Sequence, residues 1–184
     1  MTLQLGSTLI TLAPVDTAAA DGFRAAERRA VASILGFAPD HRPDGEPFSA
    51  ARPGLHISVS HCRRLAAVAV DPARKTGIDI ETLRGSLIRV AQRFLSRYEL
   101  EYYGTSPVRL LQAWTLKEAL LKCSGHLGAD LRRDVILPCG PGKSATVDGR
   151  PYNIIYSAPI SAFCIDAWLS AVTAVPQPPL PPGL

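Results

Sequence analysis

The stretch Thr76-Gly77-Ile78-Asp79-Ile80-Glu81, near the middle of the 184-residue chain, decides how the rest of the sequence is interpreted. Its β-branched residues and the turn chemistry before it predict a strand over residues 76–81. Residues i and i+2 of a strand share a face, so Asp79 and Glu81 should project together while Ile78 and Ile80 enter the core. Two carboxylates on one face repel each other unless a cation or hydrogen bonds compensate them. A solvated strand end is the simpler alternative for an isolated D-x-E.

Toward the N-terminus, the pattern predicts strands around one helix. Asp16 or Thr17 is expected to cap a helix that runs to about Leu35 and stops at Gly36. The segment 37–53, rich in Pro, Gly, Asp and Arg, is predicted to be a loop, and 71–75 a turn. The predicted strands are residues 7–13, 55–59 and 65–70, the last two joined by a hairpin at 60–64.

Toward the C-terminus, helices come first and strands follow. Ser106–Pro107 opens a helix in the favoured order of cap and then proline, and Gly125 ends it. The predicted elements are helices at 87–93, 96–103 and 107–123, and strands at 145–147, 152–156 and 162–169. This order predicts an α+β protein of two similar halves, residues 1–74 and 75–175. The proline-rich tail 176–184 is predicted to be disordered.

Composition describes an ordinary globular protein. The chain is 47% hydrophobic and 20% charged, which supplies enough apolar material for a core. No apolar run approaches the roughly 18 residues of a membrane span and no signal segment is visible, so we expect a cytoplasmic protein. The four cysteines form no C-x-x-C pair, which argues against zinc or a disulfide framework. The excess of 20 basic over 16 acidic residues is compatible with an anionic partner.

Two further segments carry candidate chemistry. Glu118 and Lys122 are four residues apart on the predicted helix, which by itself predicts an exposed ion pair. Ser60-His61 ends a strand and precedes Arg63 and Arg64, which would suit an anion, although a lone histidine in a turn is more often structural.

Together these segments describe one possible site. Asp79, Glu81 and Glu118 are hard oxygen ligands, which suit Mg²⁺ rather than zinc. Magnesium usually keeps positions open for substrate phosphates, whose charge Lys122 and His61 would hold. The site forms only if strand 76–81 and helix 107–123 lie side by side.

The ordered set of motifs resembles the surfactin-synthetase type of 4′-phosphopantetheinyl transferase. That family has a strand ending in S-H, then G-[IV]-D-x-E, and then W-x-x-K-E-A-x-x-K, which here is Trp114–Lys122. The segment Arg93–Glu99 also resembles the family's R-F-F-x-x-x-E. The resemblance covers about residues 45 to 137 and implies a pseudo-symmetric α+β fold, each half a small antiparallel sheet packed with helices.

The resemblance also implies roles for individual residues. Asp79, Glu81 and Glu118 would bind Mg²⁺, with Mn²⁺ as the alternative ion, and Ser60, His61 and Lys122 would contact the phosphates of the substrate coenzyme A. Glu99 matches the residue proposed to deprotonate the carrier serine. Ser96-x-x-Glu99 is equally a capping box, which would explain Glu99 without catalysis.

The implied reaction moves phosphopantetheine to an acyl, polyketide or peptidyl carrier protein and releases 3′,5′-ADP; the enzyme would act as a monomer. Two departures concern the 3′-phosphate of coenzyme A: the stretch before residue 45 is short for this type, and Gly45-Glu46-Pro47 stands where relatives often have Gly-Lys-Pro.

Two other functions compete with this interpretation. A Mg²⁺-dependent nuclease would require a clustered basic stripe, whereas the Lys and Arg residues here are spread along the chain. A non-catalytic module would bind coenzyme A or a carrier protein without transfer.

Overall fold

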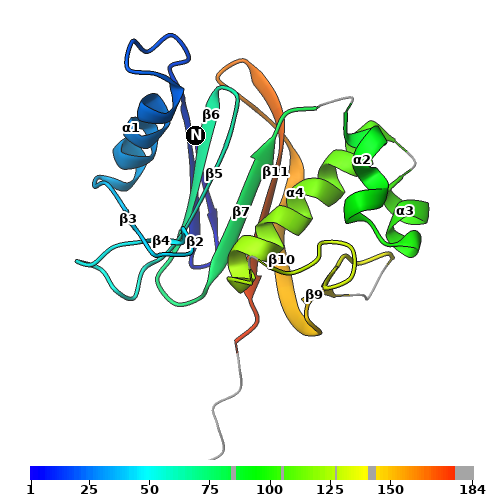
Figure 1. The fold of residues 1–184 in the computed structure, drawn as a ribbon. Coiled ribbons are helices and arrows are strands. Elements are labelled where there is room, and N and C mark those ends of the chain that lie inside the picture. The colour runs from blue at the N-terminus through cyan, green and yellow to red at the C-terminus, as the bar shows by residue number, and fades with distance from the viewer. Residues whose placement is uncertain (84–85, 105, 127, 141–143, 177–184) are drawn as a thin grey trace, which may run out of the picture.

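The computed structural model describes residues 1–83, 86–104, 106–126, 128–140 and 144–176. These residues form two antiparallel sheets packed with helices, and a short two-stranded ribbon (Figure 1), which confirms the predicted α+β class. The helices are α1 (Phe23–Leu35), α2 (Leu87–Phe94), α3 (Arg97–Tyr103) and α4 (Pro107–Ser124). The strands are β1 (Thr2–Leu5), β2 (Thr8–Pro14), β3 (Asp40–His41), β4 (Pro47–Phe48), β5 (His56–Cys62), β6 (Leu65–Asp71), β7 (Thr76–Glu81), β8 (Val135–Ile136), β9 (Ala145–Val147), β10 (Arg150–Ala162) and β11 (Ile165–Ala174).

The N-terminal sheet has the strand order β1-β2-β6-β5 and carries α1 on one face (Figure 1). Its centre is β6, whose small apolar side chains are buried on both faces of the sheet. Ala66 and Val68 pack with Val31 of α1, while Leu65 and Ala67 belong to the core on the opposite face. The alternation of a strand therefore serves two cores at once.

The C-terminal sheet has the order β7-β11-β10-β9-β8, and α4 lies along β7 and β11 (Figure 1). The apolar face of α4 packs with α2, α3 and the short strands β8 and β9. Phe94 of α2 meets Trp114 of α4 edge to face, with ring centroids 5.1 Å apart. This packing fixes the rotation of α4, and therefore which of its side chains face β7.

The two sheets meet where the edge strand β5 lies beside the edge strand β7. Ile78 and Ile80 of β7 are buried in the same core as Ile10 of the N-terminal sheet and Leu169 of β11. The sheets take their strands from residues 2–71 and 76–174, respectively. The family resemblance also implies that residues 1–74 hold the coenzyme A phosphate contacts and residues 75–175 the metal and catalytic residues, and this division stays a prediction.

Several predicted boundaries were wrong. The first helix begins at Phe23 rather than after Asp16, because Asp16 accepts the amide of Ala18 in a local turn and Gly22 stands at the N-cap. The hairpin turn is only 63–64, which puts Ser60 and His61 within β5.

Other elements differ from the predicted pattern as well. The predicted strand 162–169 is interrupted by a turn at Phe163 and Cys164, whose φ angles are 54° and 59°. Strand β1 and the ribbon β3–β4 were not predicted. Of the tail predicted to be disordered, residues 177–184 lie outside the described residues.

Candidate active site at the joint of the two sheets

The site begins with the close approach of α4 to β7 at Gly77. A Cβ placed on Gly77 would lie 2.0 Å from the carbonyl oxygen of Ala119 and 2.7 Å from the amide nitrogen of Cys123. No other residue type fits against the helix backbone at this distance. Gly77 therefore lets α4 pack directly on β7, two residues before Asp79 and on the same face of the strand.

Asp79 and Lys122 connect the strand to the helix. Lys122 Nζ donates to Asp79 Oδ1 at 2.8 Å and to the carbonyl of Ile78 at 3.1 Å. Ser60 of the neighbouring β5 donates its hydroxyl to the same Oδ1 at 2.6 Å. Asp79 is thus held from both sides through one oxygen, which leaves Oδ2 as the oxygen available to a cation.

Glu118 lies half-buried one helical turn before Lys122, on the same side of α4. Burial raises the pKa of Glu118, and the negative charge of Asp79 raises it further, while Lys122 acts in the opposite direction. The predicted ion pair within the helix does not form; Lys122 reaches across to Asp79 instead. Two carboxylates held close enough to perturb each other make a position where a cation would be stabilised.

Glu81 projects from the same face of β7 as Asp79, opposite Trp168 of β11. Its Oε1 accepts the amide of Thr82 at 2.8 Å. As the side chains stand, the described part of the chain holds no group of three His, Cys, Asp or Glu residues close enough to bind a metal ion. Asp79 and Glu118 nevertheless suit Mg²⁺, because that ion is commonly bound by one or two carboxylates and completed by waters and substrate phosphates.

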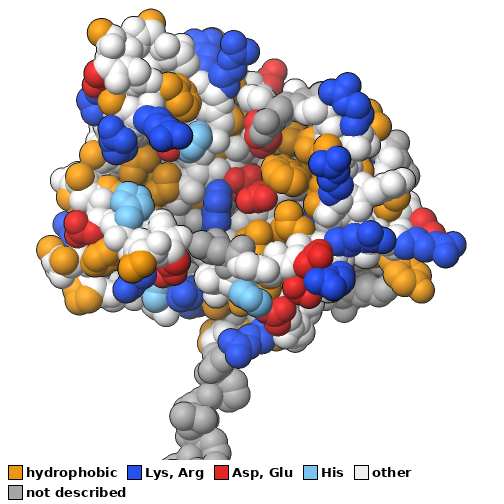
Figure 2. Space-filling model, viewed as in Figure 1, with side chains coloured by type: hydrophobic (Ala, Val, Ile, Leu, Met, Phe, Trp, Pro, Cys, Tyr) orange, Lys and Arg blue, Asp and Glu red, His pale blue; other side chains and the backbone are white. Residues whose placement is uncertain are grey.

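The cluster lies between two hollows. One, of about 230 Å³, is lined by Lys122, Ile57, Val59 and residues 44–47. The other, of about 450 Å³, is lined by Phe23, His61, Arg63, Glu81, Thr82 and Leu83, among others. Figure 2 shows acidic side chains beside a basic one in the middle of this face, with further basic side chains along its rims. The first hollow thus borders Lys122 and the second borders Glu81.

His61 is one position from Ser60 on β5 and therefore points the other way. Its Nε2 lies 3.1 Å from Glu27 of α1, and its ring packs edge-on against Phe23. His61 shares a hollow with Glu81, but it would have to exchange Glu27 for a phosphate in order to bind one.

Glu99 has a different environment, with only 1% of its surface exposed. Its Oε2 accepts the amide of Ser96, completing the capping box that the sequence suggested, and also the ammonium group of Lys117 at 2.8 Å. Its Oε1 accepts the amide of Leu137 at 2.7 Å. These contacts favour the role of helix cap over that of base.

Lys117 is the partner that the sequence did not reveal. Its ammonium group is completely buried and donates to Glu99 and to the carbonyls of Leu131 and Val135, both at 2.6 Å, which uses all three of its protons. Burial lowers the pKa of Lys117, against the opposing effect of Glu99. Its place on the apolar face of the predicted helix was the available signal, because a lysine there needs a buried acceptor.

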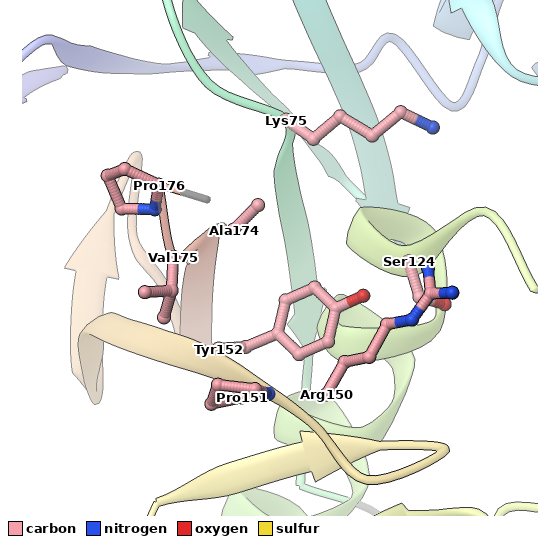
Figure 3. Close-up of a pocket in the computed structure, with 8 residues that line it drawn as sticks. All are labelled: Lys75, Ser124, Arg150, Pro151, Tyr152, Ala174, Val175 and Pro176. Atoms are coloured by element: carbon pink, nitrogen blue, oxygen red, sulfur yellow. The ribbon is translucent and has the colours of Figure 1, made fainter. Parts of the chain in front are cut away.

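A further hollow, of about 580 Å³, lies elsewhere, at the C-terminal end of α4 (Figure 3). Tyr152 and Arg150 extend over Ser124 there, and Lys75 projects from the start of β7. The two cations lie near the negative end of the helix dipole, and Lys75 is also 3.6 Å from Glu46. The helix end and Glu46 account for the two basic residues of this hollow, so we place the site at the carboxylate cluster instead.

The fold and the cluster together define an α+β protein with a carboxylate–lysine site at the joint of two sheets. Residues 75–156 match the family model of the 4′-phosphopantetheinyl transferase superfamily. The matched residues make up less than half of the chain, and over them the chain is similar to that superfamily. They include Asp79, Glu81, Glu99, Glu118 and Lys122.

Curated relatives agree with the family match. The chain is 35% identical to the 4′-phosphopantetheinyl transferase HetI of Nostoc sp. over 119 residues, which is 58% of this chain and 50% of the relative. It is 33% identical to the 4′-phosphopantetheinyl transferase of Bacillus subtilis, over 44% of this chain and 38% of the relative. It is 32% identical to the 4′-phosphopantetheinyl transferase psf-1 of Bacillus pumilus, over 45% and 37%. The matches thus span half or less of each relative.

Proposed function

We propose that this protein transfers the 4′-phosphopantetheine arm of coenzyme A to a serine of an apo carrier protein, in a reaction that requires Mg²⁺. The observation that carries the proposal is the cluster of Asp79, Glu118 and Lys122 across β7 and α4, within the region that matches the superfamily. The two nearby hollows give an extended substrate room on both sides.

Each residue of the cluster has a part in this proposal. Asp79 and Glu118 bind the metal ion, and Glu81 joins them by turning away from Thr82. The ion supplies neutralisation of the pyrophosphate charge when it is bound. Lys122 holds a phosphate of coenzyme A, and His61 is a second phosphate contact once it leaves Glu27.

The bond changes are those of a phosphoryl transfer. The carrier serine oxygen forms a bond to the β-phosphorus of coenzyme A and loses its hydroxyl proton to solvent. The bond from that phosphorus to the bridging oxygen breaks, and 3′,5′-ADP leaves with that oxygen. Most of the rate enhancement in such reactions comes from positioning and charge neutralisation. Glu99 supports the site by fixing α3 against α4.

Glu46 bears on how the nucleotide end of coenzyme A is held. It lines the hollow beside Lys122, and its carboxylate lies 3.2 Å from Arg42 and 3.6 Å from Lys75. The two cations more than balance its charge. We expect Arg42 and Lys75 to supply positive charge in place of the lysine that relatives often have there.

The direct test is to incubate the protein with coenzyme A, Mg²⁺ and an apo carrier protein, and to measure the intact mass of the carrier. Fatty-acid, polyketide and peptide carriers should be tried separately. The proposal expects a gain of one phosphopantetheine on at least one carrier and no gain with EDTA. Binding of coenzyme A without transfer to any of the three would instead indicate a binding module.

A further inference from the structure

Ser60 lies where the two sheets meet, and its hydroxyl has contacts on both sides of the joint. It is 5% exposed, and its Oγ is 2.6 Å from Asp79 Oδ1 and 3.3 Å from the amide nitrogen of Ile80. The amide can only donate, so it takes up a lone pair of Oγ. The single hydroxyl proton is therefore directed at Asp79.

The joint explains why a serine is needed at this position. Strands β5 and β7 lie side by side without backbone pairing between them, so the amides of β7 that face β5 find no carbonyl partner there. Ser60 accepts the amide of Ile80, and two residues earlier Ser58 accepts the amide of Ile78 at 3.1 Å. Both serines replace a backbone acceptor, but only the hydroxyl of Ser60 also donates to Asp79.

We propose that Ser60 is a positioning residue for the metal ligand Asp79. This differs from the family resemblance, which implied that Ser60 contacts a phosphate of coenzyme A. The Ser60 hydroxyl and the Lys122 ammonium converge on Oδ1, which restrains the carboxylate and leaves Oδ2 as the oxygen that would bind a cation. Residues that orient a metal ligand in this way commonly change metal affinity by about 10–100-fold when they are removed. The inference rests on the proposed function only in taking Asp79 as a metal ligand.

Ser58 provides a matched control. Ser58→Ala removes an amide acceptor from the same strand joint, and Ser58 is buried to the same degree, at 3% exposed. Both alanine variants should therefore lower the melting temperature, and Ser60→Ala should lower it more because it also loses the bond to Asp79. Ser60→Thr keeps an oxygen at the γ position and should therefore keep the contact to Asp79. If Ser60→Ala does not fold, Ser60→Cys takes its place in the experiment, because a thiol is of similar size and only a weak donor.

The experiment is a calorimetric titration of each protein with Mn²⁺ alone, without coenzyme A or carrier. We expect Ser60→Ala to bind Mn²⁺ about tenfold more weakly than wild type, while Ser58→Ala and Ser60→Thr stay within about twofold. The KM for coenzyme A should change little in Ser60→Ala when Mg²⁺ is saturating.

Wild-type Mn²⁺ affinity in Ser60→Ala together with a raised KM for coenzyme A would overturn the inference in favour of a phosphate contact. Equal weakening in Ser58→Ala and Ser60→Ala would also overturn it, because the effect would then belong to the strand joint. The proposed function is judged separately: a wild-type protein that modifies no carrier, while Ser60→Ala still loses Mn²⁺ affinity, would refute the transferase and leave the role of Ser60 standing.

Discussion

Glu118 is a residue at which stability and activity oppose each other. Its carboxylate is half-buried beside Asp79, and both burial and that neighbouring charge raise its pKa. A raised pKa means that the protonated form suits the folded state, so this contribution to stability is present at low pH and is lost as pH rises through the folded pKa. At neutral pH the charge destabilises the fold until a cation binds.

The Glu118→Gln variant separates the two effects. We expect it to lower turnover by about a hundredfold, because a charged metal ligand is lost. We also expect the melting temperature without metal to rise by about 1–4 °C, because the repulsion from Asp79 disappears. Differential scanning fluorimetry with and without Mg²⁺ measures this: the ion should stabilise wild type and not the variant. A melting temperature that falls instead would contradict the repulsion, and equal stabilisation of both proteins by Mg²⁺ would contradict the ligand role.

At the scale of elements, the approach of α4 to β7 determines whether the cluster forms. Gly77→Ala introduces a methyl group against the backbone of Ala119 and Cys123, so the helix must move away from the strand. We expect a loss of about 1–3 kcal/mol in the free energy of unfolding, measured by urea denaturation. Turnover should fall by more than the loss of folded protein explains, because Glu118 and Lys122 move with the helix.

The matched control is Gly54→Ala, since a Cβ there meets no atom within 4 Å. It should leave stability and turnover within error of wild type. Wild-type turnover in Gly77→Ala would show that the spacing of helix and strand does not control the site.

The contact of α3 with α4 depends on the buried pair of Glu99 and Lys117. Glu99→Gln should lower the melting temperature by about 10 °C, because breaking a buried ion pair costs about 3–5 kcal/mol. Well below that temperature, turnover per folded molecule should stay within about threefold of wild type, because a residue that acts through packing does not alter the chemical step. A loss of a hundredfold or more in fully folded protein would assign Glu99 as the base.

The sequence predicted best those elements whose signals are local. The strand at 76–81 alternates clearly, and the helix of α4 has a serine cap, a proline at its first position and a glycine stop. The predicted start of α1 was wrong because the Asp16 side chain accepts the amide of Ala18 in a local turn. Such turns compete with helix capping for aspartate side chains. The turn at Phe163 and Cys164 has positive φ angles without the glycine or asparagine that normally indicates them.

At the scale of the whole molecule, the connection between the sheets leaves β6 at Asp71. Burial would raise the pKa of Asp71, but hydrogen bonds from the hydroxyls of Thr8 and Ser7 and from the amides of Ala73 and Arg74 outweigh it and lower the pKa to about 2. Because the folded pKa lies below the ordinary value of 3.8, this stabilisation is present above that value and is lost as pH falls through about 2.

Asp71→Asn should therefore lower the melting temperature at pH 7 by about 5 °C, since it weakens a buried network of hydrogen bonds. Its melting temperature should also depend less on pH than that of wild type between about pH 4 and pH 2. Thermal scans across this range measure both effects. Parallel pH profiles for the two proteins would show that Asp71 does not carry the acid sensitivity.

The contacts across the joint of the two sheets could not be predicted from the sequence. Asp79, Glu118 and Lys122 were predicted to form one site on the condition that their strand and helix lie together, and α4 does pack on β7. The hydrogen bonds of Ser60 could not be predicted, because a sequence pattern indicates strands but not that β5 and β7 meet without backbone pairing.

None of the helices in the described residues is long and apolar enough to span a membrane.

The central claim is that the carboxylates at this joint support metal-dependent transfer. The most direct measurement is the intact mass of an apo carrier protein after incubation with coenzyme A, Mg²⁺ and either wild-type protein or Asp79→Asn. The account predicts a gain of one phosphopantetheine with wild type, none after EDTA, and at least about a hundredfold slower gain with Asp79→Asn. Equal rates for the two proteins, or transfer that persists in EDTA, would contradict it.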